Sequence, residues 1–364
     1  MLPKLNGNLL FFVLLSFSMI ACNETVFISG VKEISAPEKT EELYMERIKC
    51  DEIYSEYITV YDSLIISSCP NAHDYFFYVA DLNHNKLLGA FMKKGQGPNE
   101  YLGLAQIRRI EKKGDDICAL TYEPTRRELL EWNISKSIAT GMDSVVSLGY
   151  YEEPRDALSL TYNGIYMIGK RKYIGYLPGF FLKNKDRQYL PEYWILKGEN
   201  AVPLKGISFV ERNIENDQSI VASHSFFASV WAINPDNSKI VNAMKWLEQI
   251  NIMDIETANS MSYRVKGSPG EGIFKSGMDD PELQYEDVVC NQKSIYALYI
   301  GAKPSKYEKN MGGQWIHEYD WNGNFIAKYH LQNSVIRLCL DSYSNILYGY
   351  DAYEDALYRI KTIN

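Results

Sequence analysis

Short apolar runs separated by turn residues recur along this chain from about residue 43 to its end. The C-terminal part shows the pattern most clearly, because each run there is followed at once by a typed turn such as Asn322-Gly323 or Ser344-Asn345. Such a chain can fold only as a sandwich, a barrel or a propeller. The C-terminal runs are Ser294–Ile300, Trp315–Trp321, Phe325–Leu331, Val335–Asp341, Ile346–Tyr350 and Ala356–Ile360.

Length and local self-similarity favour the propeller. A chain of 364 residues is too long for one simple sandwich. In three places a strand-like residue precedes an aspartate that enters a turn, namely Asp81, Asp254 and Asp320. We expect each carboxylate to accept hydrogen bonds from backbone N–H groups of its turn. With repeats of about 50 residues, residues 43–364 are predicted to form an all-β propeller of roughly six blades, each of four antiparallel strands.

The spacing of apolar residues in one segment fits either a helix or strands. Apolar residues between Val241 and Ile252 are spaced in a way that also suits an amphipathic helix. Because long helical periodicity is otherwise scarce, we interpret this segment as a hairpin. The blade boundaries between residues 140 and 235 are the least defined by the sequence.

The N-terminus has the features of a secretory signal peptide over residues 1–21, with Lys4 before an apolar run and Ala21 at its end. Met19-Ile20-Ala21-Cys22 resembles a bacterial lipobox, which implies that Cys22 carries a lipid. The alternative is a plain secretory signal. The apolar run, about 12 residues, is shorter than the roughly 20 residues that span a membrane. Residues 22–42 are polar and are expected to form a lipidated tether and lead-in.

These features predict a protein of the bacterial cell envelope that is held at a membrane by its lipid. The outer membrane is favoured, and the side of the membrane stays open. The formal charge of −8 argues against nucleic acid as a partner, because phosphate binding needs clustered Lys and Arg.

The five cysteines that follow Cys22 show no CxxC pair. Cys118 and Cys339 lie in apolar, strand-like surroundings, where a free thiol behaves as a small hydrophobe. We expect mostly unpaired thiols, with one or two disulfides as the alternative in an oxidising compartment. The cysteines in question are Cys50, Cys69, Cys118, Cys290 and Cys339.

No motif has catalytic or metal-ligand spacing. The five histidines are scattered, HExxH is absent, and there is no Gly-x-Ser-x-Gly elbow. Adjacent acids such as Asp279-Asp280 are more typical of solvated loops than of a glycosidase pair. The sequence therefore predicts no catalytic residue, no metal and no cofactor, and it leans away from an enzyme without deciding the question.

Lys94-Gly95-Gln96-Gly97-Pro98-Asn99-Glu100-Tyr101 resembles the Gly-x-Gly-Pro-Asn-Glu-aromatic signature of the TolB-like six-bladed propeller lipoproteins of Bacteroidetes. Because members of that family are largely uncharacterised, the resemblance implies a fold and a cellular address and little about function. From the residues themselves, the signature is a tight structural turn. Gly95 and Gly97 can take positive φ, Pro98 fixes the bend, and Asn99 and Glu100 can tie the loop to backbone donors.

A stretch rich in aromatic and basic residues is the candidate binding loop. Rings and cationic groups at a propeller mouth can grip a glycan or an acidic peptide. The alternative is that the rings fill space between blades. The candidate residues are Arg171, Tyr173, Tyr176, Phe180, Phe181, Tyr189, Tyr193 and Trp194.

These observations favour a non-enzymatic binding or scaffolding lipoprotein whose ligand is a glycan, a peptide or a protein. Two alternatives stay open. A propeller enzyme acting on polysaccharide predicts several carboxylates or histidines in the central channel. A structural subunit of an envelope complex predicts a large apolar patch on one face.

Overall fold

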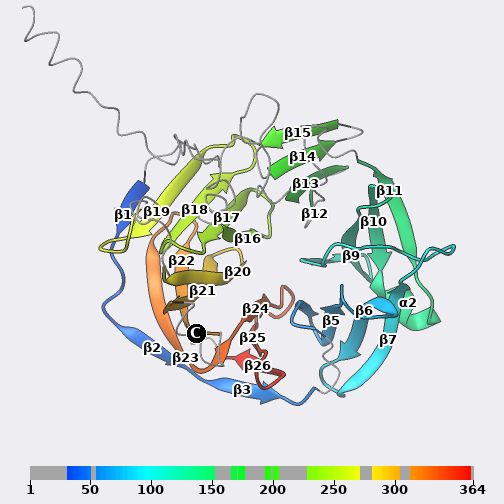
Figure 1. Cartoon of the computed structure of the whole chain (residues 1–364), viewed down its shortest axis with the longest axis horizontal. Coiled ribbons are helices and arrows are strands. Elements are labelled where there is room, and N and C mark those ends of the chain that lie inside the picture. The colour runs from blue at the N-terminus through cyan, green and yellow to red at the C-terminus, as the bar shows by residue number, and fades with distance from the viewer. Residues whose placement is uncertain are drawn as a thin grey trace, which may run out of the picture.

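Six sheets surround a common axis, and the predicted six-bladed β-propeller is confirmed (Figure 1). Four of the sheets have four strands and two have five. Successive strands within each blade pair antiparallel, as in the blade formed by the last strands of the chain. The computed structural model describes residues 31–50, 55–151, 165–169, 171–176, 193–197, 200–204, 228–270, 281–303 and 312–361.

The first three blades follow one another in the chain. Blade 1 consists of β4 (Ile58–Tyr61), β5 (Leu64–Ser68), β6 (Tyr75–Asp81) and β7 (Lys86–Lys93). Blade 2 consists of β8 (Ile110–Lys113), β9 (Asp116–Glu123), β10 (Glu128–Asn133) and β11 (Val145–Tyr150). Blade 3 consists of β12 (Ile165–Gly169), β13 (Lys172–Tyr176), β14 (Tyr193–Lys197) and β15 (Asn200–Leu204).

The remaining blades continue around the ring. Blade 4 consists of β16 (Ser229–Ile233), β17 (Lys239–Met244), β18 (Gln249–Asp254) and β19 (Ser260–Val265). Blade 5 consists of β20 (Leu283–Cys290), β21 (Ser294–Ala302), β22 (Gly313–Asp320) and β23 (Phe325–Val335). Blade 6 has three C-terminal strands, β24 (Arg337–Leu340), β25 (Leu347–Asp351) and β26 (Ala356–Ile360).

The N-terminal segment completes the ring. β3 (Met45–Ile48) pairs antiparallel with β26 and supplies the fourth strand of blade 6, so the two ends of the chain close the propeller together. Before it, β1 (Val31–Ile34) and β2 (Thr40–Leu43) add parallel to the outer edges of blades 4 and 5 (Figure 1). Part of the stretch expected as a tether and lead-in therefore lies in the propeller sheets.

The apolar core is divided among the blade interfaces. Each of six buried clusters joins two neighbouring blades, and the last joins blade 6 back to blade 1. At the interface of blades 1 and 2, for example, the Trp132 ring stacks on Phe77 at 5.2 Å between centroids. Period-2 alternation places residues on both faces of each sheet, so every blade packs against both neighbours.

The aspartate turns form as expected. The Asp81 carboxylate accepts the backbone N–H of Asn83 at 2.8 Å, and that of Asp254 accepts the N–H of Thr257 at 2.8 Å. Asp320 accepts from Asn322 and Asn324, each at 2.9 Å. Each of the three aspartates lies at the turn between the third and fourth strands of its blade. Its carboxylate stabilises the turn by accepting backbone N–H groups that do not pair with a neighbouring strand.

Two further expectations are confirmed, and one element is new. Val241–Ile252 is a hairpin of β17 and β18. The five cysteines in the described residues are free thiols. The short helix α2 (Ile134–Thr140) was not expected from the sequence; Asn133 caps it by accepting the Lys136 N–H at 2.9 Å, and Gly141 ends it at φ 69°.

Candidate functional site

A cavity of about 680 Å³ occupies the centre of the ring. The first strand of every blade contributes to its wall: β4, β8, β12, β16, β20 and β24. Pockets of this size commonly hold small ligands. Because it touches all six blades, this central channel is the candidate functional site.

A chain of ion pairs lines one part of the channel and links four blades. Lys245 Nζ of blade 4 lies 3.3 Å from Glu286 of blade 5, whose carboxylate accepts from Arg337 of blade 6 at 3.2 Å. The Arg337 guanidinium also lies 3.8 Å from Glu56, just before blade 1, and over the Tyr57 ring at 5.4 Å from its centroid. Burial disfavours the Arg337 charge, yet the surrounding carboxylates raise its pKa above the ordinary value.

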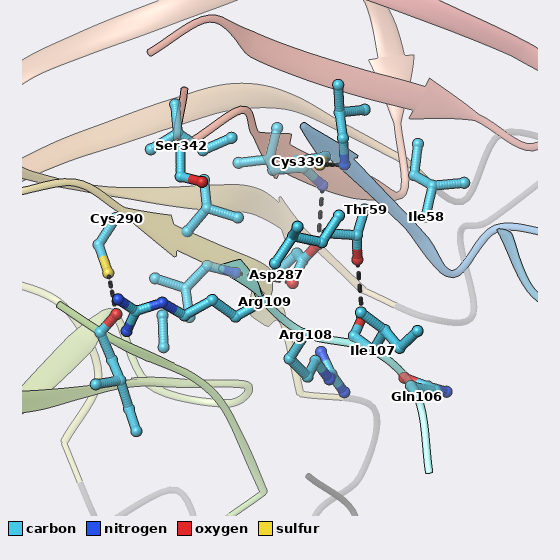
Figure 2. Close-up of a pocket in the computed structure, with 18 of the residues that line it drawn as sticks. Ile58, Thr59, Gln106, Ile107, Arg108, Arg109, Asp287, Cys290, Cys339 and Ser342 are labelled. Carbon is cyan, nitrogen blue, oxygen red and sulfur yellow. Dashed lines mark hydrogen bonds between the residues drawn. The ribbon is translucent and has the colours of Figure 1, made fainter. Parts of the chain in front are cut away.

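Asp287 lies beside this chain and is almost fully buried, at 8% exposure. Its carboxylate accepts the backbone N–H of Val288 at 3.0 Å and that of Leu338 at 2.8 Å, which ties blade 5 to blade 6 (Figure 2). Burial raises the pKa of the Asp287 carboxyl, and the charge of Arg337 opposes that rise.

Arg109 crosses between blades that are not neighbours. Its guanidinium donates to Asn237 Oδ1 at 2.5 Å and to the Pro235 carbonyl at 2.8 Å, so it links blade 2 to the first turn of blade 4. Glu111 lies 3.9 Å from the same guanidinium. Arg109 therefore has its hydrogen-bonding capacity largely satisfied within the protein.

Arg108, Gln106 and Lys112 line the same wall, and they differ from Arg109. Within the ranges that the structure describes, none of their side chains makes a hydrogen bond or an ion pair. Figure 2 shows Arg108 and Gln106 below Asp287 in the pocket. This wall therefore presents unengaged donors to the cavity.

The predicted candidate loop has a different structure. Tyr173 and Tyr176 lie on β13, Tyr193 and Trp194 lie on β14, and all four are buried. Tyr173 and Trp194 pack between blades 2 and 3, whereas Tyr176 and Tyr193 pack between blades 3 and 4. These four side chains fill the space between blades, which was the alternative interpretation.

The other candidate residues do not lie on these strands. Arg171 is exposed in the turn between β12 and β13. Phe180, Phe181 and Tyr189 lie outside the described residues.

The signature loop is a turn built around one carboxylate. Glu100 accepts from the Gly97 N–H and from Lys93 Nζ, each at 2.8 Å. Gly95 has φ 153°, and a Cβ on it would lie 2.0 Å from Glu100 Oε2, so only glycine leaves room for this carboxylate. Positive φ falls on Asn99, at 62°, and not on Gly97. Pro98 lies between them, at the exposed tip of the turn.

Lys94 secures the base of the loop. Its ammonium group donates to the carbonyls of Cys69, Pro70 and Ala72 at 3.0, 2.7 and 2.5 Å, and lies 4.5 Å from the Phe76 ring centroid. The loop thus joins the edge of blade 1 to the start of blade 2. Nothing in this arrangement contributes a side chain to the channel wall.

Metal binding and membrane insertion can also be assessed from the described residues. In the described part of the chain, no three histidine, cysteine or acidic side chains gather as a metal site would require. Across the same residues, no helix combines the length and the apolar character needed to cross a bilayer. Cys22 lies outside the described residues.

Residues 177–343 match the family model described as TolB-like 6-blade propeller-like. This part of the six-bladed propeller resembles the TolB-like propellers. The chain matches no curated protein sequence. Among solved structures, it resembles a member of the DUF4221 family from Bacteroides vulgatus ATCC 8482, with a TM-score of 0.61 and 11% identity over 89% of this chain and 100% of the other.

A second similar structure comes from Bacteroides fragilis NCTC 9343 and is described as an exported protein. It gives a TM-score of 0.52 and 10% identity, over 92% of this chain and 100% of the other. At such identities the protein shares only its fold with both, and the channel residues must be interpreted from their own chemistry.

Sequence reasoning missed the channel residues, although a signal for some of them exists. Glu286 and Asp287 are the charged residues of the largely apolar strand β20, and Arg337 opens the apolar strand β24. Charges inside such runs are expensive unless they are paired or face a polar cavity. Arg108 lies in a segment without regular secondary structure and gives no comparable signal.

Proposed function

We propose that this propeller is a binding protein whose ligand occupies the central channel. The observation that carries the proposal is the cavity of about 680 Å³ bounded by the first strands of all six blades. A ligand there would contact every blade at once, which makes the rigid ring itself the specificity element.

The polar groups of the channel support binding more than catalysis. Four carboxylates line the cavity, as the enzyme alternative requires. Three of them, however, neutralise arginines: Glu56 and Glu286 lie beside Arg337, and Glu111 lies beside Arg109. The fourth, Asp287, accepts two backbone hydrogen bonds. Carboxylates engaged in this way stabilise the wall and are poorly placed to act as general acid or nucleophile.

The test is calorimetric titration of the purified protein with panels of oligosaccharides and peptides. Ser342 is exposed and lines the cavity, so Ser342→Trp narrows the channel without filling the core. Ser147 is exposed on β11, at the outer edge of blade 2, and Ser147→Trp is the matched control. We expect Ser342→Trp, but not Ser147→Trp, to weaken binding by roughly tenfold or more. A ligand that binds both variants as well as the unaltered protein does not occupy the channel, and a bound ligand that is turned over would favour the enzyme alternative.

We further propose that the protein acts in the cell envelope and is anchored through lipid on Cys22. Support comes from the signal-like residues 1–21, from Met19-Ile20-Ala21-Cys22, and from the exported protein of similar fold. Cys22→Ser is expected to abolish labelling by a fatty-acid analogue and release the protein from membranes, whereas Cys118→Ser is expected to change neither. Labelling that survives Cys22→Ser would contradict the anchor. Separation of inner and outer membranes on a density gradient then decides between the two, with the outer membrane expected.

A further inference from the structure

We propose that the channel recognises an oxyanion, that is, a carboxylate, sulfate or phosphate group on a small ligand, through the guanidinium of Arg108. The inference rests on the proposed function and adds the chemistry of the ligand to it. It is based on a difference among the cationic side chains of the channel: some are paired within the protein, and others are not.

The cations of the channel divide into two groups. Arg337 and Lys245 are held by Glu286, and Arg109 is held by Asn237, Pro235 and Glu111. Arg108 and Lys112 have no such partners in the described part of the chain. Both side chains are exposed on the wall of the cavity, and an exposed arginine that lines a cavity without a partner is available to an anion.

The carboxyl group of Asp287 does not satisfy Arg108. Both oxygens of Asp287 are already accepting backbone N–H groups, from Val288 and from Leu338. Arg108 acts on Asp287 only at a distance, by lowering the pKa that burial raises. Its charge also reaches Tyr166 on the wall of blade 3, whose pKa burial raises to about 12 and Arg108 lowers. The Arg108 charge on the cavity wall therefore acts on groups of blades 3 and 5.

Further donors line the same cavity. Gln106 and Lys112 line the cavity on the same segment as Arg108, and neither side chain is engaged within the described residues. A guanidinium can donate two parallel hydrogen bonds to one oxyanion, and an amide N–H or an ammonium group can meet a third oxygen. The protein as a whole is acidic, at −8, so this basic wall is a local exception.

The channel's size decides between ligand classes. A cavity of about 680 Å³ suits a small molecule, such as an acidic mono- or disaccharide, and is too small for a folded partner. The anionic group would lie against Arg108, and the rest of the ligand would lie along the inner strands.

The experiment is a set of calorimetric titrations with matched probes. The oxyanion probes are galacturonate, galactose 6-sulfate and galactose 6-phosphate, and galactose is the neutral parent; inorganic sulfate and phosphate test the subsite alone. We expect at least one oxyanion probe to bind about tenfold more tightly than galactose. Arg108→Ala should remove that advantage, Arg108→Lys should keep part of it, and the ranking of the three acids identifies the preferred group.

Arg127→Ala is the control, because Arg127 is exposed in the turn between β9 and β10, away from the channel wall. It should bind every probe as the unaltered protein does. Equal affinity of Arg108→Ala and the unaltered protein for the oxyanion probes would overturn the inference, as would the absence of any oxyanion binding at millimolar concentration. A neutral ligand that Ser342→Trp excludes, and that Arg108→Ala binds normally, would overturn the inference and leave the proposed function standing.

Discussion

The guanidinium of Arg337 lies 3.2 Å from the carboxylate of Glu286, across the boundary between blades 6 and 5. Together with Lys245 and Glu56, the pair forms a charged belt around part of the channel. This belt explains how an acidic propeller keeps several ionised groups near its axis. The charges compensate one another within the belt.

Removing the centre of the belt should destabilise the protein. Arg337→Met would leave Glu286 and Glu56 without their shared partner, at an expected loss of about 1–3 kcal/mol in the free energy of unfolding. Arg47→Met is the control, since Arg47 pairs with Glu354 at the exposed surface and should cost less than about 1 kcal/mol. Urea denaturation measures both, and an equal effect of the two substitutions would contradict the role of the belt.

The same variant should change the pH dependence of stability. Burial raises the folded-state pKa of Asp287, and Arg337 limits the rise, so the pKa should climb further in Arg337→Met. A raised carboxyl pKa means that the folded state holds its proton more tightly than the unfolded state, so stability falls as pH rises through the folded pKa. The loss caused by Arg337→Met should therefore be larger at pH 8 than at pH 5. A loss that is the same at both values would show that Asp287 does not sense Arg337.

His317 should change stability with pH in the opposite direction. It is buried at 3% exposure beside Tyr299 and Tyr285, and burial lowers its pKa from 6.5 to about 3. Between these values the unfolded chain binds a proton that the folded protein does not, so stability falls as pH drops from about 6.5 towards 3. His317→Gln should flatten this decline, whereas His73→Gln, at an exposed position, should leave it unchanged. Unfolding curves at pH 7, 5.5 and 4 test the difference, and parallel declines would count against it.

The signature loop predicts a contrast between two glycines. Gly95→Ala would force a Cβ onto the Glu100 carboxylate, whereas a Cβ at Gly103 would meet only Pro124 Cγ at 3.5 Å. Gly95→Ala should therefore lower stability by about 1–3 kcal/mol, and Gly103→Ala should cost less than about 1 kcal/mol. Thermal unfolding distinguishes the two variants, and a Gly95→Ala protein as stable as Gly103→Ala would show that the loop tolerates rearrangement.

Ring closure by the N-terminal segment can be tested at Leu43. This side chain, the last of β2, is 1% exposed in the cluster between blades 5 and 6. Leu43→Ala should cost about 2–5 kcal/mol, and Glu41→Ala, at an exposed position of the same strand, should stay within about 0.5 kcal/mol. If chemical denaturation finds the two variants alike, the segment does not stabilise the ring.

The sequence predicted the fold well where pairing is local. Hairpins such as β17–β18 and the turns at Asp81 and Asp320 join neighbouring runs, and their residues carry the necessary turn chemistry. β1 and β2 escaped notice because they pair parallel with strands far along the chain and show little apolar alternation. α2 was missed because it is short, and its β-branched and serine residues are weak helix formers.

The candidate site was harder to predict, because a propeller's channel is defined only when the ring is closed. Tyr193 and Trp194 looked like binding residues because they belong to an aromatic and basic stretch, yet strand geometry turns them towards the neighbouring blades. Arg108 has no sequence motif around it. It becomes a candidate only through its neighbours in the fold. Arg109 already donates hydrogen bonds within the protein, and both carboxylate oxygens of Asp287 already accept backbone N–H groups.

A crystal structure of the protein with a ligand chosen from the titrations would show directly whether the ligand lies in the channel. We expect electron density for the ligand inside the ring, in contact with the first strands of several blades and hydrogen-bonded to Arg108. Density confined to the outer blade edges, with the channel free of ligand, would contradict it.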